Sequence, residues 1–197
     1  MPVYPTLLIV AASLVGSFCA PPQTCKMLKP RKIELTSPTF NGKWYLQRWT
    51  TQYEPYRNEF SQLDTAFLII SPVVQMNKTL IKAYMRMGND CMSETEAFRL
   101  ANNGLEFTSE LKEYLVFRVL STKIASCLII HTQERKQGKM YHTIALYTRN
   151  PDGMENGRKI FEDQVQCLGM KKDKILVLPQ QKEECVPQNT QEAIQRK

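Results

Sequence analysis

Apolar and polar residues alternate along most of the chain between residues 43 and 148. Aromatic and β-branched residues stand in short runs separated by turn-forming residues, a pattern typical of strands joined by turns. In one such run Ile81, Ala83 and Met85 would share one face, with Lys82 and Tyr84 on the other. The tight-turn signal at 102–104 adds a hairpin. The pattern predicts eight strands, at 43–51, 65–71, 80–87, 92–100, 105–108, 114–120, 124–131 and 140–148.

Short strands in direct succession favour an antiparallel up-and-down sheet. Eight strands are enough for such a sheet to close into a barrel, which removes its free edges and leaves room for one small ligand. The polar and aromatic segment 52–64 and the charged segment 133–139 are predicted as loops, and Pro72 is expected to end the second strand.

The apolar period changes after residue 148. Ile160, Phe161, Val165 and Leu168 recur at helical spacing, and Gly169 supplies a stop. A short ninth strand is expected at 175–178. The predicted fold class is therefore all-β with one α-helix: an eight-stranded antiparallel up-and-down β-barrel, a C-terminal helix packed on its wall, and the short ninth strand.

The first 20 residues carry no charged side chain, and 6–15 is apolar but too short to span a bilayer. We interpret 1–19 as a secretory signal peptide, with a cut after residue 20 and a retained lipid-contacting anchor as alternatives. Residues 20–40 would form an N-terminal arm, 41–187 the folded domain and 188–197 a flexible tail. The protein is thus predicted to be secreted and extracellular.

Charge and cysteine content narrow the function classes. The 26 Lys and Arg outnumber the 19 Asp and Glu, but no basic run interleaved with aromatics is present, which argues against nucleic-acid binding. The six cysteines have no CxxC spacing and only two histidines accompany them, so neither a metal site nor a redox dithiol is predicted. Asn77, in the sequon Asn77-Lys78-Thr79, is a candidate glycosylation site.

Two motifs carry a family resemblance. Gly42-Lys43-Trp44 at the start of the first strand and Leu146-Tyr147-Thr148-Arg149-Asn150-Pro151 at the end of the eighth resemble the lipocalin family. The segments 56–60, 67–72, 77–79, 114–123, 167–168 and 182–187 are similar to the orosomucoid (alpha-1-acid glycoprotein) branch, with apolipoprotein M and fish toxin-binding lipocalins as near relatives. The family's middle motif, Thr-Asp before an aromatic, is not recognisable. The resemblance implies that Arg149 covers Trp44 at the closed end of the barrel, where a guanidinium gains cation–π attraction.

The resemblance also implies the disulfides Cys25–Cys167 and Cys91–Cys185, each worth up to roughly 4–5 kcal/mol because both close long loops. Cys127 would remain unpaired, since the third bridge of apolipoprotein M would need a cysteine between 149 and 161, where this chain has none.

A barrel of this size with an apolar interior can hold a small lipophilic molecule. An inward-facing Arg48 would need an acid, water or a ligand head group as partner, so it is a candidate anchor for a polar or anionic ligand end, with a position at the solvent-exposed mouth as the alternative. Alternation and the family resemblance together predict the inward, ligand-binding set Leu46, Arg48, Leu68, Ile70, Met85, Met87, Phe98, Phe117, Ile129 and Tyr147.

The favoured function is a secreted carrier of the acute-phase or plasma type for a lipid, steroid, drug or toxin, without cofactor, metal or catalysis. One alternative is an enzyme of prostaglandin-isomerase type, in which Cys127, on the same strand as Ile129, would face the interior; no His or Lys activator accompanies it, and an inert buried thiol is the simpler interpretation. The other is an immunomodulatory binding protein. A small hydrophobic or amphipathic ligand is the expected partner, a lipoprotein or cell-surface receptor is a further candidate, and the protein is expected to be a monomer.

Overall fold

The computed structural model describes residues 26–151, 153, 155–179 and 184–185 of the 197-residue chain. The predicted signal peptide at 1–19, Cys25 and the predicted tail at 188–197 lie outside the described residues. Within the described part, no helix is long and apolar enough to cross a membrane.

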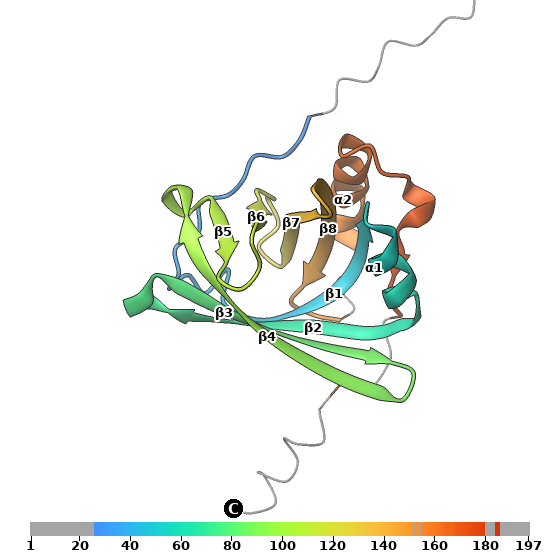
Figure 1. Cartoon of the computed structure of the whole chain (residues 1–197), viewed down its shortest axis with the longest axis horizontal. Coiled ribbons are helices and arrows are strands. Elements are labelled where there is room, and N and C mark those ends of the chain that lie inside the picture. Colours follow the sequence, from blue (N-terminus) through green and yellow to red (C-terminus); the bar gives the residue numbers. More distant parts are fainter. Residues whose placement is uncertain (1–25, 152, 154, 180–183, 186–197) are drawn as a thin grey trace, which may run out of the picture.

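Eight antiparallel strands close into a barrel, as the sequence predicts (Figure 1). Each strand pairs with the next along the chain, and β1 pairs with both β8 and β2, so the sheet closes on itself. The strands are β1 (Gly42–Thr51), β2 (Leu63–Val73), β3 (Lys78–Met87), β4 (Asp90–Ala101), β5 (Glu106–Ser109), β6 (Leu115–Leu120), β7 (Cys127–Lys136) and β8 (Lys139–Thr148).

The first strand changes partner halfway along. Its first half pairs with β2, from Gly42 opposite Ile70 to Tyr45 opposite Phe67. Its second half pairs with the short strand β9 (Leu176–Val177), which lies on that edge of β1. Because β1 begins opposite Ile70, the last residues of β2 have a free edge, and Pro72 can stay in the strand paired with Thr79 although it donates no hydrogen bond. The prediction that Pro72 ends this strand is therefore wrong.

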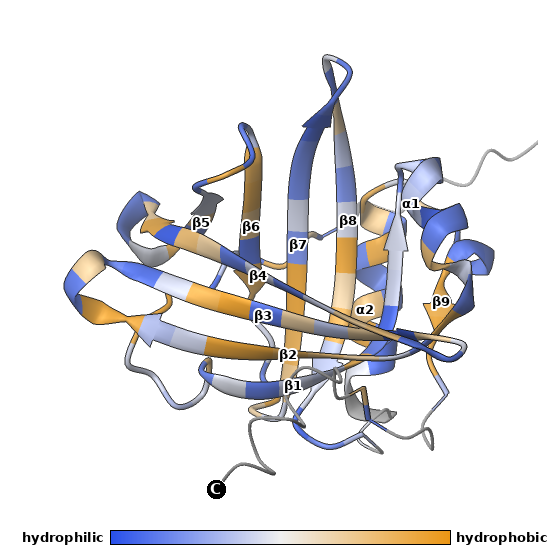
Figure 2. Cartoon of the chain, turned by 60° about the horizontal axis from the view of Figure 1, so that its bottom comes forward, coloured by the Kyte–Doolittle hydropathy of each residue, from blue (hydrophilic) through white to orange (hydrophobic). Residues whose placement is uncertain are grey.

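Two segments that were predicted as loops contain regular secondary structure. The segment 52–64 contains the short helix α1 (Glu54–Glu59) and a 3-10 turn (Phe60–Gln62), so the fold has a second helix. The charged segment 133–139 is mostly strand, because β7 and β8 continue to Lys136 and Lys139 around a two-residue turn. Gln137 and Gly138 adopt the positive φ angles that such turns require, 50° and 76°. Figure 2 shows this hairpin projecting past its neighbours with a hydrophilic tip and a more hydrophobic lower half.

The predicted C-terminal helix is present as α2 (Glu155–Cys167) and packs on the outer wall of β7 and β8. Its buried Phe161 and Val165 contact Ile129, Ile144 and Leu146 in one apolar cluster. A separate cluster around Phe40, Trp44 and Phe107 fills the interior at the closed end. The strands β7 and β8 are therefore covered by apolar groups on both faces.

Candidate functional site

The closed end of the barrel is sealed by Arg149 and Trp44. The guanidinium carbon of Arg149 lies 3.7 Å from the centroid of the Trp44 ring. Its two terminal nitrogens donate to the backbone oxygens of Lys43 at 2.9 Å, Pro38 at 2.8 Å and Asn41 at 2.7 Å. The indole Nε1 of Trp44 donates to the oxygen of Phe40 at 2.7 Å. These contacts make Trp44, which is fully buried, part of the barrel's end plug, and leave ligand binding to the rest of the interior.

A cavity of about 410 Å³ occupies the barrel toward the open end, where α1 lies. A deeper cavity of about 170 Å³ continues toward the closed end. Most of its lining is apolar and includes Ile81, Phe98, Phe117 and Ile130, and the carboxylates of Glu94 and Glu96 border it as well. Leu68, Ala83 and Tyr147 are among the residues that line both cavities. The two cavities thus adjoin and form one calyx, mainly apolar at its base.

Aromatic side chains of α1 and the following 3-10 turn cover the mouth of the calyx. Tyr56 and Phe60 line the cavity, and Phe60 packs edge-on against Trp49 of β1 with ring centroids 6.0 Å apart. Tyr53, just before α1, contacts Tyr56 and also Tyr141 of β8, with ring centroids 4.9 and 5.0 Å apart. We refer to 53–62 as the lid. Tyr53, Tyr56 and Phe60 recur at helical spacing, a signal that could have identified this helix from sequence.

The charged side chains that line the upper calyx are mostly acidic. Glu59, Glu94 and Glu134 line it, together with Lys112 as the one cationic residue among the described lining. Lys112 lies 3.2 Å from Glu96, and Lys136 of β7 lies 2.7 Å from Glu134. The hydrogen bond to Glu134 raises the pKa of Lys136 above its ordinary value. The cations near the mouth therefore already have carboxylate partners.

Most predicted inward residues border the calyx. Leu46, Leu68, Met85 and Tyr147 line the upper cavity, and Leu68, Phe98, Phe117 and Tyr147 line the deeper one. Burial raises the pKa of the Tyr147 hydroxyl. Ile70 belongs to the closed-end core, and Met87 packs in the apolar cluster around Trp49.

The predicted inward orientation of Arg48 is wrong. A bulge between Leu46 and Arg48 shifts the alternation of β1 by one residue, so Trp49 lines the calyx where Arg48 was expected. Arg48 is 8% exposed and lies 4.0 Å from Glu162 on α2. The arginine therefore lies outside the calyx, and Trp49 is a lining residue that strand periodicity alone missed.

The predicted inward orientation of Ile129 is wrong as well. Its neighbour Ile130 lines the deep cavity, whereas Ile129 points to α2 with Phe161. The fully buried run 127–130 is apolar on both faces because α2 covers the outside. Alternation therefore gave no means of choosing between the two faces.

Cys127 shares this outer face. Its side chain is 4% exposed in the cluster beneath α2, and a Cβ atom added to Gly157 of α2 would lie 2.7 Å from its Sγ. It is the one free cysteine among the described residues, and burial raises the pKa of its thiol to about 11. The inward position that the isomerase alternative requires is therefore contradicted.

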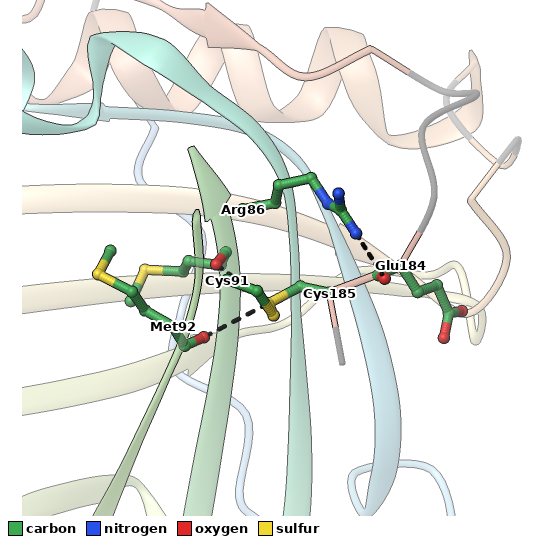
Figure 3. The surroundings of a disulfide bond; sticks show 6 residues. Arg86, Cys91, Met92, Glu184 and Cys185 are labelled. Atoms are coloured by element: carbon green, nitrogen blue, oxygen red, sulfur yellow. Dashed lines mark hydrogen bonds between the residues drawn. A yellow bond between two sulfur atoms is a disulfide. The ribbon is translucent and has the colours of Figure 1, made fainter. Parts of the chain in front are cut away.

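The predicted Cys91–Cys185 disulfide is confirmed, with Cα atoms 5.3 Å apart (Figure 3). Beside it, the Arg86 guanidinium donates to the backbone oxygen of Glu184 at 3.1 Å. The Glu184 carboxylate also accepts from Lys43 at 2.6 Å, and this contact holds its pKa below the usual range. These bonds fix residues 184–185 to the outer wall of the barrel. The predicted Cys25–Cys167 pairing involves a residue outside the described part and stays a prediction.

Asn77 lies exposed at the turn between β2 and β3, in the left-handed conformation with φ of 51°. Its side-chain nitrogen donates to the oxygen of Leu100 at 3.1 Å. The position is accessible, and glycosylation there stays a prediction.

Comparison with known proteins agrees with this architecture. Residues 41–182 match the Lipocalin / cytosolic fatty-acid binding protein family. The chain is 20% identical to human Lipocalin-15 over 156 residues, which are 79% of this chain and 84% of that protein. It is also 20% identical to bovine alpha-1-acid glycoprotein over 164 residues, which are 82% of this chain and 80% of that protein.

Solved structures give the same fold. The siderocalin Ex-FABP, described as functioning through dual ligand specificities, superposes with a TM-score of 0.66 at 20% identity, over 76% of this chain and 99% of that one. Siderocalin Q83, described with a dual ligand binding mode, superposes with a TM-score of 0.65 at 23% identity, over 75% of this chain and 93% of that one. With a closed eight-stranded barrel, an arginine over the first-strand tryptophan and a family match across most of its length, this chain belongs to the lipocalin family.

Proposed function

We propose that this lipocalin is a secreted, non-enzymatic carrier that holds one small lipophilic molecule in its calyx. The observation that carries the proposal is the pair of adjoining cavities, mainly apolar at the base and covered by aromatic lid residues at the mouth. Burial of a ligand's apolar surface there would supply most of the affinity. A lipid, steroid, drug or toxin with an extended apolar part fits this lining.

The polar end of the ligand is expected to be neutral or cationic. With Arg48 outside the calyx, the charged lining of the upper calyx consists of Glu59, Glu94 and Glu134 against the single cation of Lys112, among the described residues. A carboxylate placed among them would meet like charges, whereas an ammonium group would be attracted. We therefore expect a long-chain amine to bind roughly tenfold more tightly than the carboxylate of equal chain length, about 1.4 kcal/mol.

Secretion is supported by the predicted signal peptide and by the Cys91–Cys185 disulfide, since disulfides persist mainly in oxidising compartments. N-terminal sequencing of protein recovered from the medium of expressing cells would identify the cleavage site. Recovery of the chain only from the cell interior, with residues 1–19 intact, would contradict secretion.

A binding titration with a cavity-filling variant tests the carrier function. Ala83 lines both cavities, so Ala83→Phe should place a ring inside the calyx and weaken binding of a steroid or long-chain amine at least tenfold. The matched control is Ala97→Phe, because Ala97 lies on the opposite face of β4 from the lining residues Glu96 and Phe98. Equal affinities in both variants, or no saturable binding by the unsubstituted chain, would overturn the proposal.

The enzyme alternative is not supported. It required Cys127 in the calyx, and the thiol lies beneath α2 instead. We expect Cys127→Ala to leave steroid and amine affinities unchanged. Turnover of a lipid peroxide by the unsubstituted chain that disappears in Cys127→Ala would revive the alternative.

A further inference from the structure

The described part of the N-terminal arm, residues 26–40, is fixed to the barrel by backbone hydrogen bonds. The N–H of Arg31 donates to the oxygen of Val119 at 2.7 Å. The N–H of Ser121, just after β6, donates to the oxygen of Lys29 at 2.9 Å. Figure 1 shows the arm, in blue, running past β5 and β6. The backbone of the arm is therefore held in place before any partner binds.

The apolar side chains of the arm face the protein. Met27 and Leu28 pack against the cluster beneath α2. Ile33 and Leu35, which are 4% and 8% exposed, belong to the closed-end core. The surface that the arm presents to solvent is consequently made by its polar and charged side chains.

Positive side chains gather on this surface and on the neighbouring loop 121–126, which follows β6 and begins at the residue bonded to Lys29. The lysines of this region are exposed, and its arginine is half-buried. We call these residues the basic cluster: Lys26, Lys29, Arg31, Lys32 and Lys123.

No carboxylate among the described residues forms an ion pair with the basic cluster. Glu34 is the one acidic residue of 26–40. On α2, the carboxylate of Asp163 lies 4.0 Å from Lys159, and on the barrel Lys43 is paired with Glu184 at 2.6 Å. Like charges that are held close together repel, and a partner of opposite charge relieves that repulsion. The basic cluster is thus a surface that fits an anionic partner.

We propose that the basic cluster binds a linear polyanion of the sulfated polysaccharide class. Lys26, Lys29 and Lys32 recur every three residues, so their Cα atoms are spaced at most about 11 Å apart along the arm. Sulfate groups that repeat along a polysaccharide chain can contact several of these ammonium groups at once. Because the arm is already ordered, binding requires little further loss of backbone freedom.

Two other polyanions fit the arm less well. Insertion into a membrane surface uses exposed apolar side chains beside the cations, and those of the arm are turned inward. Single-stranded nucleic acids are bound by stacking of bases on exposed aromatic rings, and the one aromatic residue of 26–40, Phe40, is fully buried. A sulfated polysaccharide requires only the cations.

The biological setting of this inference rests on the proposed secretion, because such polysaccharides occur on cell surfaces and in the extracellular matrix. The binding itself does not depend on the calyx. The arm contacts the closed end of the barrel, whereas the lid and the mouth of the calyx lie at the open end.

Surface plasmon resonance on immobilised heparin tests the proposal. At an ionic strength of about 0.15 M we expect saturable binding, which weakens as sodium chloride is added because salt screens the charges. The double variant Lys29→Gln with Lys32→Gln should lower the affinity roughly tenfold. The matched control is Lys171→Gln with Lys174→Gln, which removes the same charge from exposed positions of the segment after α2 and should bind as the unsubstituted chain does.

Protection from chemical acetylation maps the surface without any substitution. In the presence of heparin, Lys26, Lys29 and Lys32 should be acetylated more slowly, as measured by mass spectrometry of peptides. Lys171 and Lys174 should react at the same rate with and without heparin. Equal protection of both groups would overturn the assignment to the arm.

Absence of saturable heparin binding, an equal loss of affinity in the two double variants, or no loss in Lys29→Gln with Lys32→Gln would also overturn the proposal. Tighter binding to phosphatidylserine vesicles or to a DNA fragment than to heparin would overturn the assigned class of partner. Lipophile binding in the calyx is measured separately with the Ala83→Phe and Ala97→Phe pair, so the failure of one proposal does not imply failure of the other.

Discussion

Replacing Arg149 by methionine should lower the free energy of unfolding by about 3–4 kcal/mol. The guanidinium donates three hydrogen bonds to backbone oxygens, and those to Lys43 and Asn41 are partly buried. A hydrogen bond to a charged group contributes about 1.5–3 kcal/mol when water is excluded. The third bond, to Pro38, is exposed and contributes little. Attraction to the Trp44 ring adds about 0.5–1 kcal/mol, and the methionine side chain replaces only part of the packing.

Urea unfolding, followed by tryptophan emission and far-ultraviolet circular dichroism, measures this loss of free energy. In thermal unfolding, a domain of this size should show a fall in Tm of roughly 10 °C. Arg149→Lys keeps a cation near the ring but cannot reach all three oxygens, so about half the loss is expected. Arg99→Met, at a residue whose side chain is 54% exposed, should change stability by less than about 0.5 kcal/mol. A loss below about 1 kcal/mol in Arg149→Met, or none in Arg149→Lys, would refute the assigned role of the guanidinium.

Three further predictions concern the wall and the helix packed on it. Gly157→Ala should destabilise the fold by about 1–3 kcal/mol despite the better helix propensity of alanine, because its Cβ would lie 2.7 Å from the sulfur of Cys127. In a double-mutant cycle measured by denaturation, Cys127→Ala should recover part of this loss. Additive effects of the two substitutions on the free energy of unfolding would contradict the contact. Burial, and to a lesser extent the positive charges of neighbouring His142 and Arg118, lowers the pKa of His131 to about 4. The contribution of His131 to stability is therefore present above its unfolded pKa of about 6.5 and is lost as the pH falls toward 4. His131→Gln should make the free energy of unfolding less dependent on pH across this range, and an unchanged pH dependence would count against the shift. Cys91→Ser with Cys185→Ser should cost up to about 4–5 kcal/mol in the same assay, because the bridge closes a loop of 94 residues; a loss under about 1 kcal/mol would show that the unfolded chain gains little freedom.

The pattern of the chain was sufficient for the barrel because local rules fix its strands. Alternation and turn residues place the eight strands within a few residues of their observed bounds, and the apolar spacing after residue 156 predicts α2. The largest misses lie at 52–64 and 133–139. In the second of these segments, polar side chains at the barrel mouth resemble a loop although the backbone continues as a hairpin. Solvent exposure at the open end removes the apolar signal that marks a strand elsewhere.

The lining of the calyx was only partly accessible to sequence reasoning. Leu46, Leu68 and Tyr147 border the cavity as predicted, because their strands keep regular alternation in those stretches. Arg48 does not, since the bulge before it depends on how β1 pairs with β8. Ile129 does not either, since a strand buried on both faces carries no periodic contrast between inside and outside.

The sequence by itself therefore determined the strand order, the late helix and the residues that seal the closed end, all of which rest on local propensity or on short motifs. Tertiary structure alone decided which side of each doubly covered strand faces the calyx and where the lid lies. These features depend on contacts between segments that are distant in the chain, such as β1 and residues 174–178. A one-dimensional pattern records which side chains prefer burial, but the neighbours that bury them are set by the closed barrel.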